Sequence, residues 1–295
     1  MSSLDQQVET VAREAGADLV GFANIERFNN APRENHPCSI YPQTRSIIAV
    51  AVRQSRGSLK TAEEGTYWQA YNCDSYWYLN EVIAPKILRA VVLFLEEKGY
   101  TSVQVHNPFR PHLGRQVRED MPDGPDGMIS LRVIGAACGL GELGHSKVFL
   151  TPQYGPRQRV FAIFTDAELK PTPLFRGNIC DGCQECVKGC QANAIGTTRS
   201  EKVLIEDREF SHAPLDCQAC GPVHQGRDQR FSPFVTGEEK EGELSQYGQF
   251  LQHRFRHLSI CVARGCIRSC LDHLEKKGAL EAKFKTPFIE RERWE

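Results

Sequence analysis

Residues 180–190, CDGCQECVKGC, carry four cysteines with the spacing C-x2-C-x2-C-x3-C. Thiolates at this spacing ligate cubane iron–sulfur clusters in bacterial ferredoxins, in which the fourth cysteine of the run binds a different cluster from the first three. The run therefore predicts two 4Fe–4S clusters. Each cluster needs four thiolates, so some of the ligands must come from elsewhere in the chain.

Five further cysteines follow this run, so the candidate ligands outnumber the places by one. Crossed ligation predicts that three cysteines of the run share the first cluster with a late cysteine. The ligands expected for the first cluster are Cys180, Cys183, Cys186 and Cys270. Those expected for the second cluster are Cys190, Cys217, Cys261 and Cys266.

Cys220 is the spare cysteine in this scheme, although it could replace Cys217 or Cys261. Separate C-x2-C pairs could instead form zinc sites. The short gaps between the four cysteines of residues 180–190 favour a cubane over a zinc site.

The composition is that of an ordinary globular protein, with 40% hydrophobic and 25% charged residues and a net charge of −1 in 295 residues. This charge balance gives no basic surface for DNA. The N-terminal residues lack the pattern of a signal peptide. The longest apolar region, residues 82–97, contains Lys86 and Arg89 and is too short to span a membrane. The sequence therefore predicts a cytoplasmic protein without membrane or DNA partners.

Twelve cysteines in such a chain indicate metal or redox chemistry, because disulfides are rare in the cytoplasm. Nine of them lie between residues 180 and 270. Cys38, Cys73 and Cys138 are isolated, and we expect them to be small buried hydrophobic residues.

The first part of the chain predicts interleaved helices and strands. Residues 45–52, RSIIAVAV, are typical of a strand that is buried on both faces. Apolar residues then recur every three to four positions from Ile83, which predicts a helix that ends at Lys98 and Gly99. Further strands are expected at 101–107 and 159–166, which indicates an α/β or α+β domain.

Two segments of this chain read as connections. Residues 106–127 are rich in proline, glycine and charge and predict a loop. Residues 169–178 contain two prolines and a glycine and lead directly into the cysteine run. We therefore expect two domains, residues 1–170 and residues 171–295, with metal ligation organising the second.

Gly139, Gly141 and Gly144 have the G-x-G-x-x-G spacing of a dinucleotide site. Such a site needs a strand before the glycines and a helix after them. The sequence here indicates the reverse order, which argues against a dinucleotide site. The glycines are better explained by a tight turn or by a close backbone approach to another large ligand.

The segments GADLVGFA, RSIIAVAV, LEEKGYTSVQV, ACGLGELGHSKVFLTPQYGPRQRVFAIFTDAEL and CDGCQECVKGCQANAIG follow one another along the chain. In this order they resemble the cobalamin-dependent reductases, a group that includes epoxyqueuosine reductases and reductive dehalogenases. The resemblance extends over nearly the whole chain. It implies a nitroreductase-like domain that binds base-off cobalamin, followed by a ferredoxin-like module with two 4Fe–4S clusters that pass electrons to cobalt.

The resemblance also implies particular site residues. The implied cobalamin contacts are Arg53, Gly144, His145, Ser146, Lys147, Leu150 and Phe161. His145 is a contact at most, since base-off binding in this group needs no protein histidine. Asp126 lies where the epoxyqueuosine branch has its proton donor, with Asp123 as a neighbouring candidate, and a carboxyl group near an apolar corrin would have a raised pKa. Both aspartates could also be simple turn residues beside glycines.

The chain departs from these relatives in several ways. Gln191 and Leu271 stand where proline usually follows a cluster cysteine, and the late cysteine group begins with C-x4-C. We expect neither the helical-repeat domain that many epoxyqueuosine reductases use for transfer RNA nor the twin-arginine leader of exported dehalogenases. Transfer RNA is therefore an unlikely partner on the sequence alone.

We expect an enzyme that reduces a small-molecule substrate with electrons from an external donor such as ferredoxin or flavodoxin. Two other functions are consistent with the sequence. One is an electron carrier or activase that reduces a corrinoid protein, and the other is a nitroreductase-like enzyme with flavin in place of cobalamin.

Overall fold

The apolar strand predicted at residues 45–52 forms β2 (Ser46–Arg53) at the centre of the main sheet, and all but its last residue are buried. The sheet has the order β1-β2-β6-β3, and each neighbouring pair is antiparallel. The other strands are β1 (Leu19–Asn24), β6 (Gln158–Thr165) and β3 (Ser102–Val105). The predicted mixture of helices and strands is confirmed, and the antiparallel pairing makes the fold α+β.

The structure is a computed structural model, and it describes residues 2–67, 69–105, 129–232, 234–235, 246, 248–250 and 258–289. The predicted loop at 106–127 lies outside the described residues. Strand β3 ends at Val105, just before it. Among the helices within these ranges, none is both long enough and apolar enough to cross a lipid bilayer.

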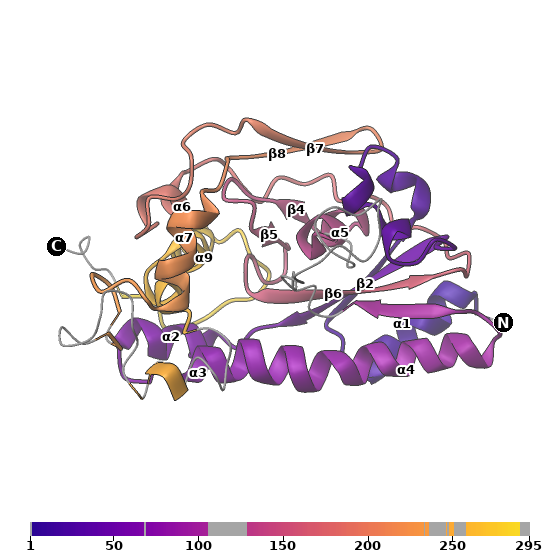
Figure 1. The fold of residues 1–295 in the computed structure, drawn as a ribbon, viewed down its shortest axis with the longest axis horizontal. Helices are drawn as coiled ribbons and strands as arrows, with labels where there is room; N and C mark the ends of the chain where they lie inside the picture. The colour runs from indigo at the N-terminus through magenta and orange to yellow at the C-terminus, as the bar shows by residue number, and fades with distance from the viewer. Residues whose placement is uncertain are drawn as a thin grey trace, which may run out of the picture.

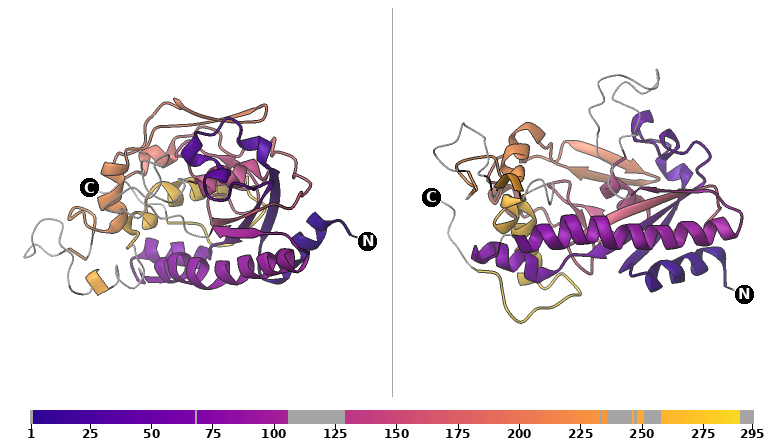
Figure 2. Two further views of the ribbon diagram at one scale, coloured as in Figure 1. Left: turned by 45° about the vertical axis from the view of Figure 1, so that its right-hand side comes forward. Right: turned by 60° about the horizontal axis from the view of Figure 1, so that its bottom comes forward.

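One face of the sheet is covered by α4 (Ala84–Glu97) and α1 (Leu4–Glu14), which lie beneath the sheet in Figure 1 and side by side in the right view of Figure 2. Apolar residues at helical spacing form the face of α4 that packs on the sheet, where Ile87, Leu88 and Val91 are fully buried. The helix ends as predicted, because Gly99 adopts the left-handed conformation (φ 87°) that continues no helix.

The opposite face of the sheet packs against α5 (Leu131–Ala137) and two hairpins, β4–β5 (Glu142–Leu143 and Phe149–Leu150) and β7–β8 (Glu201–Ile205 and Arg208–His212). Ile205 and Phe210 of the second hairpin join the apolar core that contains β2 and β6. Residues on both sides of position 170 therefore share one core. The boundary at that position stays a prediction.

The glycine stretch connects α5 to β4, so a helix precedes it and a strand follows it, as the sequence indicates. A Cβ atom at Gly141 would lie 1.9 Å from the carbonyl oxygen of Leu150. This contact explains the glycine, since only a residue without a side chain lets the two backbones of this hairpin approach so closely.

The helices that carry the late cysteines gather at one end of the sheet, on the left in Figure 1. They are α6 (Glu185–Lys188), α7 (Cys217–Gln225), the 3-10 turn Ile260–Ala263 and α9 (Cys266–Lys276). The buried carboxylate of Glu63, in α2 (Arg56–Glu64), accepts hydrogen bonds from Arg268 Nε (2.9 Å) and from the backbone N–H of Ile289 (3.1 Å). These bonds attach α9 and the following segment to α2.

A π-helical segment, Asn72–Ile83, leads directly into α4. The short helix α3 (Gln69–Tyr71) precedes it. Wide helical turns of this kind are rare and are often found at functional sites. The segment carries Ser75 and Tyr76, which both contact side chains of the cavity described below.

The packing of α4 against the sheet generates a stability prediction. Leu88→Ala should lower the free energy of unfolding by about 2–5 kcal/mol, because it leaves a cavity beneath a fully buried side chain. Leu93→Ala on the same helix is the matched control, since Leu93 is 37% exposed and its loss should cost about 0.5 kcal/mol. Urea unfolding followed by circular dichroism measures both. Equal losses would contradict the placement of α4.

Candidate functional site

Cys180, Cys183, Cys186 and Cys270 line a single small cavity. Cys186 lies in α6 and Cys270 in α9, which pack against each other, while the other two lie in the loop before α6. In every pair among the four, one thiol raises the pKa of the other. Burial is the largest cause of the raised pKa of Cys270. The structure thus brings together the four residues that the sequence predicts for one cluster.

A second group of thiols contains Cys190, Cys220, Cys261 and Cys266. Each pair within this group also interacts electrostatically, so all four sulfur atoms surround one region. Burial, followed by Cys190 and Cys220, raises the pKa of Cys266 to about 12. Burial likewise raises the pKa of Cys261 well above its usual value.

The structure differs from the sequence prediction at α7, where Cys220 lies with the second group and Cys217 does not. Cys217 is the first residue of the helix and is exposed, whereas Cys220 is half-buried one turn later. Asp216 caps the helix by accepting hydrogen bonds from the backbone N–H groups of Gln218 and Ala219. This cap starts the helix so that its second cysteine faces Cys190, which spacing alone could not reveal.

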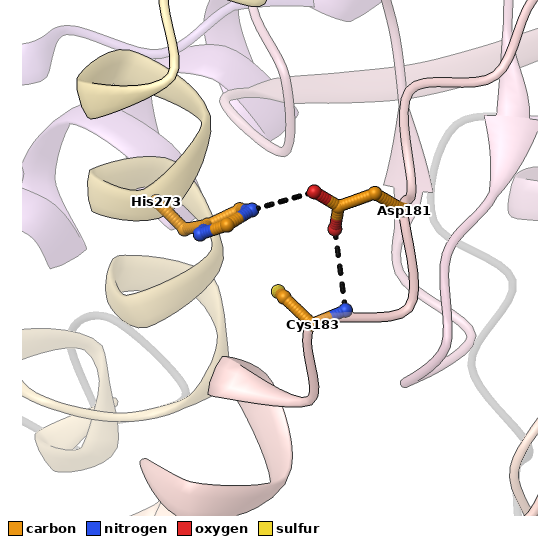
Figure 3. A group of neighbouring side chains, drawn as sticks. All are labelled: Asp181, Cys183 and His273. Carbon is orange, nitrogen blue, oxygen red and sulfur yellow. Dashed lines mark hydrogen bonds and ion pairs between the residues drawn. The ribbon is translucent and has the colours of Figure 1, made fainter.

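Asp181 braces the loop of the first group against α9, as Figure 3 shows. Its carboxylate accepts hydrogen bonds from His273 Nε2 (2.9 Å), Lys277 Nζ (2.7 Å) and the backbone N–H of Cys183 (3.2 Å). The bonds from Lys277 and His273 hold the pKa of Asp181 well below its usual range. Asp181, His273 and Cys183 have ligand atoms within 4.8 Å of one another, but the Asp181 carboxylate already pairs with Lys277 and accepts a hydrogen bond from His273.

Two polar side chains donate hydrogen bonds to cysteine sulfur atoms. Arg199 Nη2 donates to Cys180 Sγ (2.6 Å) in the first group. In the second group, His224 Nδ1 lies 3.4 Å from Cys261 Sγ, and its Nε2 lies 2.9 Å from the hydroxyl of Tyr76. In the tautomer with the proton on Nδ1, His224 points an N–H at the sulfur and its Nε2 accepts from the Tyr76 hydroxyl.

A larger cavity of about 730 Å³, open to solvent, lies beside the second group of thiols. Its wall includes Cys217, His224, Tyr71, Tyr76 and Arg159, together with Gln54, Arg132, Lys147, Gln158, Val160 and His212. Two contacts hold Arg159 in this wall. Its guanidinium lies 4.2 Å from the ring centroid of Tyr76, and its Nε donates to Ser75 Oγ.

Two buried polar atoms belong to residues that line this cavity. Arg159 Nη2 and Gln54 Oε1 are buried and make no hydrogen bond within the described ranges. Burial would lower the pKa of Arg159, but Tyr76 and Tyr71 more than offset it and hold the pKa above its usual value. Burial raises the pKa of Tyr71 to about 12. The cavity thus presents the Arg159 cation and the neutral Tyr71 phenol to a bound molecule.

The cobalamin contacts implied by resemblance fall into three places. Gly144, His145, Ser146 and Leu150 line the cavity of the first thiol group instead of the larger cavity. Lys147 does line the larger cavity. The prediction for Asp126, like that for Asp123, lies outside the described residues.

Phe161 and Arg53, two more of the implied cobalamin contacts, lie away from both cavities. The side chain of Phe161 is buried between the sheet and α4, because strand alternation places it, like Ile163, on the face of the sheet that α4 covers. Arg53 is largely exposed and pairs with Asp18 (3.4 Å). Neither side chain reaches the cavity wall described above.

The isolated cysteines also differ from one another. Cys138 is fully buried in the core, and burial raises its pKa to about 12, as expected for a small hydrophobic residue. Cys38 and Cys73 are only partly buried, so that prediction was wrong for both.

Sequence reasoning missed most of the cavity wall. Arg159 could have been noticed in the sequence, because it is a charged residue near the start of the otherwise apolar strand β6. The contacts of His224 and Arg199 with sulfur atoms left none, because each joins segments more than 15 residues apart in the sequence.

The chain was compared with known proteins by sequence and by fold. No model of a protein family matches the chain. A tetrachloroethene reductive dehalogenase of Desulfitobacterium hafniense is 36% identical over 110 residues, which is 34% of this chain and 20% of that protein. The corresponding enzyme of Dehalobacter restrictus is 36% identical over 94 residues, or 28% of this chain and 17% of that protein. The chain resembles reductive dehalogenases. The matched part spans about a fifth of the length of these relatives.

Solved structures share the fold. The catabolic reductive dehalogenase NpRdhA aligns with a TM-score of 0.54 and 14% identity over 96% of this chain and 38% of that chain. An epoxyqueuosine reductase from Bacillus subtilis aligns with a TM-score of 0.52 and 14% identity over 94% of this chain and 83% of that chain. The predicted resemblance to reductive dehalogenases and epoxyqueuosine reductases is therefore confirmed.

These comparisons also bear on the prediction about transfer RNA. An epoxyqueuosine reductase of the same fold has been solved with a tRNA stem loop, and it aligns with this chain at a TM-score of 0.52 and 14% identity. The exclusion of transfer RNA as a partner is not supported.

The exposure of Cys217 generates a prediction for the protein without metal. Of the twelve cysteines, all of which the structure describes, Cys217 is the exposed one. It should react first with iodoacetamide, because buried thiols such as Cys266 stay protonated and the thiolate is the nucleophile. Peptide mapping after short labelling identifies the site. Cys217→Ser should remove the earliest modification and Cys220→Ser should keep it, and the opposite pattern would refute the placement of α7.

Proposed function

We propose that the two thiol groups bind two 4Fe–4S clusters. Cys180, Cys183, Cys186 and Cys270 would hold one cluster, and Cys190, Cys220, Cys261 and Cys266 the other. The observation that carries the proposal is that every pair within each group interacts, as four ligands of one cluster must. Zinc would draw four sulfurs to about 2.3 Å from a single ion, whereas the first group surrounds a cavity.

The larger cavity is the proposed cobalamin site. Cobalamin carries amide side chains around an apolar ring, and the buried Arg159 Nη2 and Gln54 Oε1 are polar atoms that such groups would satisfy. His224 and Cys217 place this cavity next to the second thiol group. The proposed architecture is thus a nitroreductase-like domain over residues 1–170 and a ferredoxin-like module over residues 171–295, with cobalamin bound base-off.

The proposed activity is reduction of a small molecule in this cavity. Cobalamin would supply a cobalt centre that accepts electrons one at a time from the clusters and delivers them to the substrate. Replacing a halogen by hydrogen takes two electrons and one proton and releases halide, and removing an epoxide oxygen as water takes two electrons and two protons. The electrons would come from an external donor such as ferredoxin or flavodoxin.

The residues of the chain would then handle charge and protons. Arg159 stays protonated, so it would stabilise the negative charge that develops on a leaving halide or oxygen. Tyr71 and Tyr76 line the same cavity as Arg159. Asp126 remains the proton donor proposed from the sequence. A solvent-open cavity of this size favours an enzyme over an electron carrier, which needs no substrate site.

The metal assignment predicts iron content. Protein reconstituted without oxygen should hold about eight irons per chain, from two cubanes with four cysteines each. Cys220→Ser should lose about four of them, while the matched variant Cys217→Ser should keep all eight. Iron analysis and the cluster absorbance measure this. Zinc in place of iron, or loss of iron from Cys217→Ser alone, would overturn the assignment.

The cofactor assignment predicts that added cobalamin is retained through gel filtration and shows a base-off absorption spectrum. Binding should weaken in Arg159→Met, which removes the buried cation, and should persist in Arg45→Met, which removes an exposed arginine. Titration followed by absorbance gives both affinities. Retention of flavin instead would establish the flavin-dependent alternative, and retention of neither cofactor would favour the electron carrier.

A further inference from the structure

Arg199 lies at the first thiol group and donates hydrogen bonds through both Nη2 and Nε. Its Nη2 donates to Cys180 Sγ at 2.6 Å, and its Nε donates to His145 Nδ1 at 3.4 Å. The backbone N–H of His145 donates to the same sulfur at 3.3 Å. Cys180 Sγ therefore receives two hydrogen bonds, one of them from a full positive charge.

His145 holds the guanidinium in this position. The imidazole is 4% exposed, and its Nε2 lies 2.9 Å from the carbonyl oxygen of Gly196, so Nε2 carries the proton. Nδ1 is then an acceptor, which fits the donation from Arg199 Nε. One neutral tautomer of His145 thus satisfies both contacts and fixes Arg199 against the sulfur.

We propose that Arg199 raises the reduction potential of the cluster held by Cys180, Cys183, Cys186 and Cys270. This inference rests on the proposed two-cluster function. Net charge, solvent exposure and hydrogen bonds to the sulfurs set the potential of such clusters. Reduction adds one electron and makes or breaks no bond, so a cation in contact with a ligand sulfur stabilises the reduced state more than the oxidised one. Arginine stays charged at all accessible pH values, so this contribution does not vary with pH.

The second cluster receives a different donor. His224 is neutral when Tyr76 donates to its Nε2, and its Nδ1–H then points at Cys261 Sγ. A neutral donor stabilises added negative charge less than a charged one does. Arg199 and His224 therefore act on separate clusters, and each substitution should move one potential and leave the other.

The test is a redox titration of the reconstituted protein followed by electron paramagnetic resonance, which resolves two reduction midpoints. Arg199→Gln removes the charge and should lower one midpoint. Arg199→Lys keeps the charge without the two-edged contact and should give an intermediate value for the same midpoint. His224→Leu is the matched control and should lower the other midpoint. Iron content is measured for every variant.

Unchanged midpoints in an Arg199→Gln protein that holds full iron would overturn the proposal, and so would an equal shift of both midpoints. If Arg199→Gln loses a cluster, the midpoint of Arg199→Lys decides, since it must lie below that of the unchanged protein. Failure of the proposed function would look different, because the unchanged protein itself would then lack two cluster signals.

Discussion

The crowding of eight thiols at one end of the sheet, several of them desolvated, is the constraint that shapes the rest of the molecule. Metal ligation requires thiolates, yet burial raises the pKa of Cys261, Cys266 and Cys270 and so opposes their ionisation. Positive ions are the natural compensation for such a collection of sulfur atoms. The secondary structure there is correspondingly sparse, with α6 only four residues long, because ligation can replace packing as the organising force.

This end of the molecule is nevertheless connected to the sheet through apolar contacts. Leu271 and Leu274 of α9 pack in one cluster with Leu150 of β5. The position of Cys270 is thereby tied to the hairpin that follows the glycine stretch. Gly141 serves the same end, since the close approach it permits brings β5 to where α9 can contact it. The sulfur atoms and the sheet thus share one scaffold.

The limits of sequence reasoning follow from the range of each interaction. Strand β2 and helix α4 were predictable, because hydrophobic periodicity is local. The first thiol group was predictable from spacing and crossed ligation. The second was predicted with Cys217 in place of Cys220, because the choice depends on how α7 is capped and turned. The place of Phe161 depends on which helix covers β6, and no local pattern reports that.

Helix α9 contributes Cys270 to one group and Cys266 to the other. Residues four apart on a helix lie on one face, with Cβ atoms about 5–6 Å apart. In the proposed two-cluster arrangement, a single hydrogen-bonded turn of α9 would therefore set the distance between the clusters. Because electron tunnelling depends steeply on distance, motion of the surrounding loops would then have little effect on electron exchange. Inserting one residue into that turn would rotate one of the two thiols away from its group and interrupt the path between the clusters.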